Sequence, residues 1–600
     1  MVTVVHSFKH REINKQCQDV SFILGNKAGS FFHSGNTAKS RYMGFYCDIK
    51  GKIFRTIEDI QPIAKEEITH FKNYFYSVER NRKSLREHFF VPHGRNALLY
   101  RLSTAGRVNI IVDCKEIYDN RNWGRHYAIS REQECTVISF QKKTDSREDD
   151  SHDKEEYALY VAIHSDGHHI QKPIGWIEHI YESDKQRNSE PWKRYVVQAL
   201  TLQGSSFAFA VSEEKQKAID EAHYCYVNAL QLEEEQQRNF EDTIENASLP
   251  LKKIKNPELF FGTIAAVNSL YHSIILKHKK ARLVAGYPWF FQQWSRDELV
   301  SLKGCMLIKQ YDVVMNVLKE YYHSIDEKGG LLAHQQNKVA CADAPGWLLY
   351  RLNDIKKKIA LPSFANVKKI EKILAAQIAY RSSQGLAHNG NKETWMDSIG
   401  RYGIRIEIQA MRLHMLRFLF NLTKKREYLL QEHAMKAKVR REFLHDGILY
   451  DGVNDNTIRP NVFLAYYLFP GLLSVREWKQ VLSNALIELF LPWGGLATIS
   501  KNSPLFNANH TGEDPKSYHN GDSWFYVNNA AAICMLRLDE DMFDKQINAI
   551  MNASCHEILW QGAIGHHAEV SSASFLQSAG CLQQTWSSAL FLELMCEKFC

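Results

Sequence analysis

Two kinds of hydrophobic pattern divide the chain into two parts. In the first part, apolar and polar residues alternate in short segments such as ALLYRL (97–102) and RVNIIVDC (107–114), which flank a Thr-Ala-Gly turn. The runs YALYVAIHS (157–165) and SSFAFAVS (205–212) continue the pattern. Alternation of this kind is typical of half-buried β-strands. We therefore predict an N-terminal antiparallel β-sandwich domain of about ten strands over residues 1–212.

The second part has the residue spacing of helices. The segment 213–250 is rich in charges and helix-forming residues, which predicts a helical linker. Farther on, apolar residues recur every three or four positions in eleven or twelve segments, as at Val314, Leu318 and Tyr321. Paired helices in that number predict an all-α (α/α)6 toroid over residues 251–600, with the inter-helix loops gathered at one end.

The composition excludes several classes of function. The 75 Lys and Arg residues exceed the 68 Asp and Glu residues by only seven in 600, so we expect no nucleic-acid partner. No run of about 18 apolar residues appears, and we expect no membrane partner. The start of the chain has polar residues where a signal peptide needs apolar ones, and the twelve cysteines lack CxxC spacing. These features predict a cytoplasmic protein with free thiols and indicate no oligomeric state.

Histidine pairs in the sequence do not predict a metal site. His566-His567 and the DGHH stretch (166–169) lack a third ligand at zinc-like spacing, and HExxH is absent. No Gly-rich phosphate loop is present either, so we expect neither a metal nor another cofactor. The segment 142–156 carries many charges and no aliphatic residue, which predicts an exposed loop.

The inter-helix loops hold most of the unusual residues of the helical part. Five of them combine Trp or Tyr with a carboxylate, an amide or His: 286–299, 341–347, 393–410, 517–529 and 562–589. A pyranose has apolar faces that lie on aromatic rings and a rim of hydroxyls that require donors and acceptors. One such loop is more often explained by core packing or helix capping, but five in succession favour a sugar site.

Six motifs in these loops occur in an order and spacing that resemble those of one family. They are GYPWFFQQWSRDELVSLKG, CADAPGW, ETWMDS, IEIQA, YHNGDSW and GCLQQTWSSA. The family is the glucosidase domain of glycogen debranching enzymes, particularly the shorter prokaryotic-type amylo-α-1,6-glucosidases. The stretch LGNKAGSFFHSGNTAKSRYMGFY (24–46) is similar to the family's N-terminal motif, so the resemblance covers nearly the whole chain.

The resemblance implies a glycoside hydrolase that releases α-1,6-linked glucose from branch points of trimmed glycogen or dextrin with inversion. Inversion needs one carboxylic acid and one carboxylate, roughly 6.5–9.5 Å apart. Asp397 matches the Asp of the family's T-W-M-D motif, which implies that it acts as the general acid. The alternative role for Asp397 is a helix N-cap before SIGRYGI. Glu569 aligns with the Glu of the family's P-E-[IL]-x-D-G loop and is the candidate base. Ser572 stands where that loop has its Asp.

The remaining family positions imply contacts with the sugar. Arg296 and Asp297 would bind glucose hydroxyls as a donor fork and an acceptor, each compensating the other's buried charge, at a helix start that forms the floor of the glucose subsite. The other implied binding residues are the acceptors Asp343 and Glu407, the polar contacts His519, Asn520 and Gln584, and the ring platforms Trp294, Trp395 and Trp586. Each of them has a structural alternative, a satisfied polar residue or a core ring.

Departures from the family leave two alternatives open. Ser295 replaces the Gly of W-G-R-D, Asp522-Ser523 replaces Thr-Val, and Phe525-Tyr526 replaces Pro-Trp, which indicates a changed substrate pocket. The first alternative is a related (α/α)6 glycosidase that acts on a different α-glucoside. The second, motivated by Ser572, is a catalytically impaired protein that binds glucan. The chain has no room for a further (β/α)8 transferase domain of about 250 residues, which disfavours the two-activity form of the enzyme.

Overall fold

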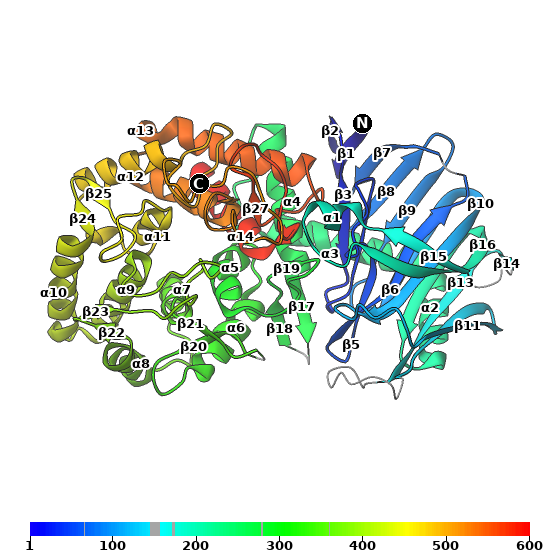
Figure 1. Ribbon diagram of the computed structural model, residues 1–600, viewed down its shortest axis with the longest axis horizontal. Coiled ribbons are helices and arrows are strands. Elements are labelled where there is room, and N and C mark those ends of the chain that lie inside the picture. The colour runs from blue at the N-terminus through cyan, green and yellow to red at the C-terminus, as the bar shows by residue number, and fades with distance from the viewer. Residues whose placement is uncertain (65, 145–155, 171–174, 278–279, 336, 359) are drawn as a thin grey trace. The chain divides into compact units, whose positions relative to one another are not determined.

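The computed structural model describes residues 1–64, 66–144, 156–170, 175–277, 280–335, 337–358 and 360–600. The described chain forms two compact units, Met1–Glu245 with Leu559–Gly565, and Asn246–Ile558 with His566–Cys600. The first unit is β-rich and the second is helical (Figure 1). The middle of the charged segment that we predict as an exposed loop, residues 145–155, lies outside the described residues. The boundaries at 212 and 250 stay predictions.

The first unit is built on one sheet. Its strands are β1 (Val2–Phe8), β2 (Arg11–Cys17), β3 (Ser21–Gly25), β4 (Phe31–Gly35), β5 (Gly44–Ile49), β6 (Lys52–Pro62), β7 (Ile68–Asn73), β8 (Ser77–Arg82), β9 (Arg86–Phe90), β10 (Ala97–Glu116), β11 (Arg125–Glu132), β12 (Cys135–Lys142), β13 (Tyr157–Ser165), β14 (His168–Ile170), β15 (Gly175–Ile180) and β16 (Lys193–Ser212). The main path runs β11-β12-β13-β16-β10-β9-β8-β7-β1-β2, and β6 joins β3, β4 and β5 to β10. Strands β14 and β15 pair with β16.

The strand number and one pairing differ from the prediction. Sixteen strands lie in the described part of this sheet, so the expectation of about ten was too low. Strands β1 and β7 pair in parallel, whereas an all-antiparallel sheet was expected. A parallel pair needs a long connection, and the five strands β2 to β6 provide it between these two.

The long strands β10 and β16 run side by side and carry most of the pairing. The first part of β10 also pairs with β9, and its second part pairs with β6. We predicted a turn at Thr104, Ala105 and Gly106, but the strand continues through these residues. The register with β16 shifts between Arg101 and Gly106, so the small residues form an irregularity within a strand.

The segment predicted as a helical linker forms two helices of the first unit, α2 (Lys215–Val227) and α3 (Ala229–Asn246), after the short α1 (Glu182–Gln186). Helix α2 packs on β13 and β16 through the buried residues Ala218, Ile219 and Ala222. Their spacing places them on one helix face, and the two alanines allow the helix to lie close to the sheet.

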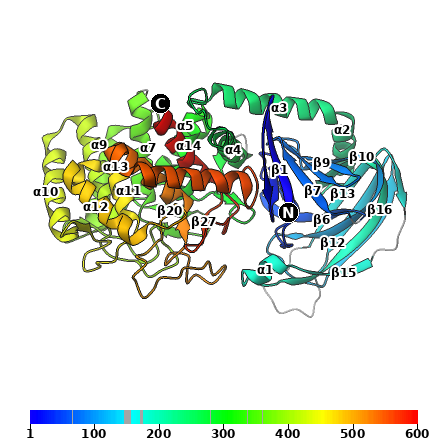
Figure 2. The ribbon, with the colours of Figure 1, turned by 90° about the horizontal axis from the view of Figure 1, so that it is seen from above.

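The second unit contains eleven helices in its described part. They are α4 (Pro257–Ser273), α5 (Ser295–Leu307), α6 (Tyr311–Ser324), α7 (Ala344–Lys358), α8 (Val367–Tyr380), α9 (Ile406–Thr423), α10 (Arg426–Phe443), α11 (Asn461–Leu468), α12 (Val475–Leu489), α13 (Phe525–Trp560) and α14 (Thr585–Phe599), with a 3-10 turn at Pro470–Leu472. The long α13 (Figure 2) is interrupted at Asp539, whose backbone is extended and whose carboxylate accepts from the Met542 N–H at 3.0 Å. This cap starts a twelfth helical segment, so the predicted eleven or twelve is confirmed.

Alternate helices of this unit pack on one another in succession. Helix α14 packs on α5, α5 on α7, α7 on α9 and α9 on α11. Helix α13 contacts α11 through the Cys534 thiol, which donates to the Phe463 carbonyl, and α14 through the Asn529 amide, which donates to the Ser587 carbonyl at 3.3 Å. Five of these six helices, all except α11, follow or begin within the motif-bearing loops, so most of the unusual residues precede or begin helices.

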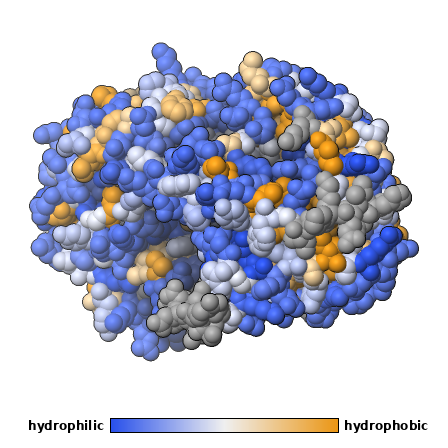
Figure 3. All heavy atoms as spheres, turned by 45° about the vertical axis from the view of Figure 1, so that its right-hand side comes forward, coloured by the Kyte–Doolittle hydropathy of each residue, from blue (hydrophilic) through white to orange (hydrophobic). Residues whose placement is uncertain are grey.

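Four short hairpins lie in the connections between helices: β17–β18 (Ile274–Lys277, Lys280–Leu283), β20–β21 (Leu331–His334, Val339–Cys341), β22–β23 (Ser382–Ser383, Leu386–Ala387) and β24–β25 (Leu444–His445, Ile448–Leu449). On the face drawn in Figure 3, apolar side chains are scattered among polar ones. None of the described helices has the length and apolar character needed to cross a membrane.

Candidate active site

Two short β-pairs join three of the motif loops in front of helices α5, α13 and α14. Strand β19 (Gly286–Tyr287) pairs with β28 (Gln583–Gln584), and β26 (Ser523–Trp524) pairs with β27 (Val570–Ser571). Segments almost 300 residues apart in sequence therefore lie together. The N-terminal ends of the helices that follow carry a partial positive charge, which favours carboxylates nearby.

Arg296, in the first turn of α5, lies between two carboxylates. Its Nε bonds both oxygens of Asp343, at 3.0 and 2.8 Å, and its Nη1 lies 3.4 Å from Oδ2 of Asp397. The side chains of Arg296 and Asp343 are buried, whereas that of Asp397 is 43% exposed. The bonded partner of Arg296 is Asp343, whereas the expected compensation between Arg296 and Asp297 acts through charge without a hydrogen bond between them in the described structure. Asp397 is the member of this group with room for a ligand.

Asp397 does not cap a helix. The residues after it are irregular until α9 begins at Ile406, so the N-cap alternative is wrong. The loss of hydration in its surroundings raises the pKa of Asp397; Arg296 opposes this shift and Asp343 adds to it. A carboxyl group with a raised pKa and accessible surface is suited to donate a proton.

Glu569 is held by two donors in a buried position. The Tyr518 hydroxyl donates to its Oε1, and the Cys581 N–H donates to its Oε2 at 3.0 Å. Burial raises its pKa to about 7; the bonds from Tyr518 and Cys581 oppose this and Asp397 adds to it. A Cβ on Gly580 would stand 2.3 Å from Oε2, so any residue other than glycine would clash with the carboxylate in its present position.

Asp297 is a third carboxyl group of the same site. Burial raises its pKa to about 8; Arg296 lowers it, and Glu569 and Asp397 both raise it. Its Oδ1 accepts from the Gln584 amide at 2.9 Å. The mutual electrostatic effects show that Asp297, Asp397 and Glu569 share one site. Near neutral pH this group of carboxyls holds at least one proton.

Aromatic rings line the same loops. Trp395 meets Trp524 edge to face at 5.4 Å between ring centroids, and Tyr526 stacks on Trp586 at 4.2 Å. Trp524 and Trp586 are 5.9 Å apart and join the two pairs. His519 stacks on Trp524 at 5.0 Å. Such a wall offers flat apolar faces beside the carboxyl groups.

Glu407 lies in a buried network rather than in the carboxyl group around Asp397. Both of its oxygens accept from Arg401, which also binds both oxygens of Asp451 at 2.7 and 2.8 Å. Arg401 donates to the Thr394 hydroxyl at 3.0 Å, and the Trp395 indole donates to Asn461 at 2.7 Å. The Asn461 amide in turn donates to Asp451 at 2.7 Å. The network therefore fixes the loop that carries Asp397.

The other predicted polar residues differ in their surroundings. Nδ1 of His519 lies 2.6 Å from the Ser398 hydroxyl, and burial lowers its pKa well below the ordinary value, so the ring is neutral. Oδ1 of Asn520 accepts from Arg459 at 3.0 Å. Trp294, the residue before α5, has its ring 5.0 Å from that of His334.

Among the described residues, four buried polar atoms of predicted site residues have no hydrogen-bond partner. They are Nε1 of Trp294, Nε2 of His519, Oε1 of Gln584 and Nε1 of Trp586. Buried polar groups are rarely left unsatisfied in folded proteins. A ligand rich in hydroxyl groups would supply the missing partners.

A comparison with models of protein families matches residues 258–593 to the amylo-alpha-1,6-glucosidase family. This span exceeds half of the chain and contains every candidate site residue. The chain belongs to the amylo-alpha-1,6-glucosidase family. It is therefore a glycoside hydrolase, in agreement with the resemblance seen in its motifs.

The solved structures similar to this family member include a bacterial glucoamylase complexed with acarbose. The TM-score is 0.59 at 11% identity, and the match covers 98% of this chain and 96% of that one. At this identity the likeness shows the fold alone. The comparison with curated proteins gave no match.

Sequence reasoning missed several residues of the glucosidase site. Tyr518 and Trp524 stand inside a quoted motif and were given no role, and Tyr526, which follows that motif, was noted only as a departure from the family. A ring or hydroxyl in a motif loop is a usable signal. Arg401 and Asp451 were missed because their importance lies in buried pairing, which the sequence pattern does not reveal.

Proposed function

We propose that this glucosidase releases α-1,6-linked glucose from branch points of an α-glucan with inversion, using Asp397 as general acid and Glu569 as general base. One observation carries the proposal. The two carboxyl groups come from separate loops, burial raises the pKa of both, and the charge of Asp397 adds to the rise at Glu569. Two carboxyl groups with these properties are what inverting hydrolysis of a glycoside requires.

In the proposed reaction each of the two carboxyl groups transfers one proton. Asp397 gives its proton to the glycosidic oxygen while the bond between that oxygen and the anomeric carbon breaks. Glu569, ionised, takes a proton from water as the water oxygen bonds to the anomeric carbon from the opposite face. The product is β-glucose. The bonds from Tyr518 and Cys581 orient the base and stabilise its ionised form.

The remaining site residues form the proposed glucose subsite. Arg296, oriented by Asp343, and the Asp297–Gln584 pair offer donors and acceptors to sugar hydroxyls. The wall of Trp395 and Trp586 offers apolar faces to the ring. We assign Glu407 to positioning, because both of its oxygens are bonded to Arg401. The complex of the similar glucoamylase with acarbose supports a substrate of linked sugar units.

We also propose that alternate helices α5, α7, α9, α11, α13 and α14 form the inner ring of an (α/α)6 toroid. The succession of their contacts and the likeness to the glucoamylase support this. The long strands β10 and β16, each paired with different neighbours along their length, support a sandwich of two layers. The division into 1–212, 213–250 and 251–600 belongs to the same proposal.

The departure at Ser572 does not argue for a lost base. Its hydroxyl donates to the Ala508 carbonyl at 2.8 Å and lies 2.8 Å from that of Ser574. Glu569, a carboxyl group with a raised pKa that is influenced by Asp397, is kept in this chain. The catalytically impaired reading is therefore disfavoured, while a different α-glucoside substrate remains the competing proposal because of the changed residues Phe525 and Tyr526.

The test is glucose release from a panel of substrates. The panel contains a limit dextrin, a 6-O-α-glucosyl oligosaccharide, and α-1,4- and α-1,1-linked glucosides at equal concentration. We expect the highest kcat/KM with the α-1,6 linkage and a loss of activity in Asp397→Asn and Glu569→Gln. A preference for another linkage would favour the alternative substrate, and wild-type activity in Asp397→Asn would remove it as the acid.

A further inference from the structure

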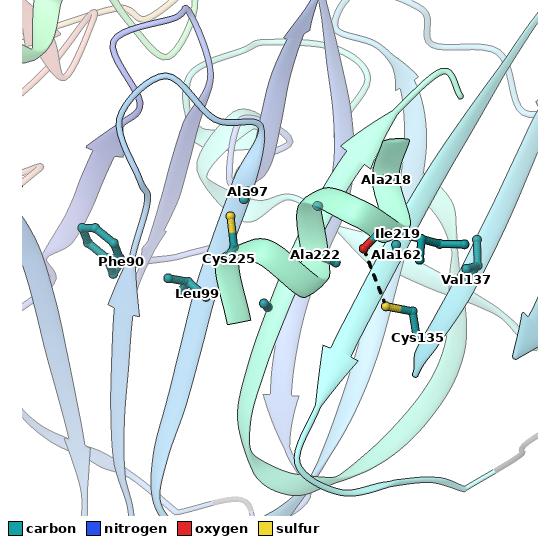
Figure 4. Packing of buried hydrophobic residues seen from close by; sticks show 12 residues of the cluster. Phe90, Ala97, Leu99, Cys135, Val137, Ala162, Ala218, Ile219, Ala222 and Cys225 are labelled. Atoms are coloured by element: carbon teal, nitrogen blue, oxygen red, sulfur yellow. Dashed lines mark hydrogen bonds between the residues drawn. The ribbon is translucent and has the colours of Figure 1, made fainter. Parts of the chain in front are cut away.

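Two imidazoles and a carboxylate converge in the first unit, outside the candidate active site. Glu134 stands in the turn between β11 and β12, His164 on β13 and His223 on α2. One ligand atom of each lies within 4.8 Å of the others. The neighbouring core, where α2 crosses the strands, is drawn in Figure 4 with Cys135 and Ile219.

The distances in this group fit a shared cation better than direct hydrogen bonds. Oε2 of Glu134 lies 3.5 Å from Nδ1 of His223 and 3.9 Å from Nε2 of His164. Both separations exceed the usual range of about 2.7–3.2 Å for N–H···O bonds. In a tetrahedral zinc site with bonds of about 2.0–2.1 Å, ligand atoms stand roughly 3.3 Å apart. The two carboxylate–imidazole separations would have to close by about 0.2 and 0.6 Å, and the two imidazole nitrogens lie within 4.8 Å of each other.

The orientation and exposure of the ligands also suit a metal. Nδ1 of His164 faces the Cys135 thiol at 3.9 Å, which directs its Nε2 toward Glu134. The side chains of Glu134 and His223 are exposed, which leaves space for water as a fourth ligand.

We propose that Glu134, His164 and His223 form a Zn²⁺ site that links helix α2 to β13 and to the turn before β12. Two imidazoles, one carboxylate and water form a donor set that zinc accepts readily. Such a link holds the helix on the sheet at its solvent side. Sequence spacing predicted no metal site, because these three ligands are too far apart in the chain to form a motif.

The test uses the untagged full-length protein, freed of metal with a chelator. It is titrated with ZnCl2 against a chromophoric competitor and, separately, with CoCl2 while visible absorption is recorded. We expect one Zn²⁺ per chain, tetrahedral Co²⁺ bands, and a rise in unfolding temperature on adding Zn²⁺. His223→Ala and Glu134→Gln change exposed side chains, and each should lower the affinity at least tenfold and remove the bands.

The matched control is His126→Ala, which removes an exposed imidazole of β11 outside the group. This variant should bind Zn²⁺ like the wild type, with the same Co²⁺ spectrum and thermal shift. The proposal is overturned if the wild type shows no saturable binding, or if His223→Ala and Glu134→Gln bind the metal as tightly as the wild type. Circular dichroism of each metal-free variant establishes that it is folded.

Discussion

Replacing Tyr518 by Phe removes the hydroxyl that donates to Glu569 and keeps the ring. That hydrogen bond is the largest contribution opposing burial, and the balance leaves the pKa of Glu569 at about 7. A hydrogen bond to a charged group contributes about 1.5–3 kcal/mol. Since one pKa unit corresponds to about 1.4 kcal/mol, the pKa of Glu569 should rise by about one to two units.

The sign of the effect follows from the role of the base. As the proposed base, Glu569 would activate water only when it is ionised, so a higher pKa should remove activity at the acid side of the pH profile. On the acid side of the profile, kcat/KM of Tyr518→Phe for a 6-O-α-glucosyl oligosaccharide should be about 10- to 100-fold lower than that of the wild type. The difference between the two proteins should shrink as the pH approaches the raised pKa of Glu569. Initial rates of glucose release, at substrate well below KM over about pH 5 to 9.5, measure the profile.

Tyr526→Phe is the matched control, because it removes a hydroxyl from the same aromatic wall. The structure shows Tyr526 stacked on Trp586 and gives it no bond to Glu569. Its acid limb should stay where the wild-type limb is. An unmoved acid limb in Tyr518→Phe would refute the reasoning, since either the bond does not set this pKa or Glu569 is not the base.

Three further substitutions test residues that position the proposed catalytic carboxyl groups or alter their pKa. Gly580→Ala places a Cβ 2.3 Å from the Glu569 carboxylate and should lower kcat/KM by about 100-fold. The control is Gly403→Ala, which is also at positive φ but has open space around it and should leave kcat/KM unchanged. Arg401→Met leaves the buried Glu407 without its ion-pair partner and Asp451 with Arg405 as its remaining one, and should cost about 3–5 kcal/mol, measured by urea unfolding; unchanged stability would contradict this. Arg296→Gln removes the cation that lowers the pKa of the general acid, so the basic limb of kcat/KM should move to higher pH, and a shift to lower pH would oppose that assignment.

Local spacing predicted much of the fold. The three-to-four periodicity gave the number of helices in the second unit, and alternation placed β13 at 157–165. The parallel pairing of β1 with β7 was not predictable, because it depends on a partner more than sixty residues away. The small residues at 104–106 have the composition of a turn, yet pairing with β16 on one side keeps them within a strand.

The site was predictable to the extent that its residues stand in motifs. Arg296, Asp397 and Glu569 follow from the resemblance, and the structure gives each carboxyl the environment that its expected chemistry needs. The bonding partners were not predictable. Tyr518 reaches Glu569 across 51 residues of sequence, and Arg401 acts through buried carboxylates that only folding brings to it.

The stereochemistry of the first product tests the central claim most directly. Proton NMR recorded within the first turnovers on an α-1,6-linked glucoside distinguishes β-glucose from α-glucose before mutarotation. The account predicts β-glucose from the wild type and loss of that signal in both Asp397→Asn and Glu569→Gln. Initial release of α-glucose, or β-glucose formed at the wild-type rate by Glu569→Gln, would contradict it.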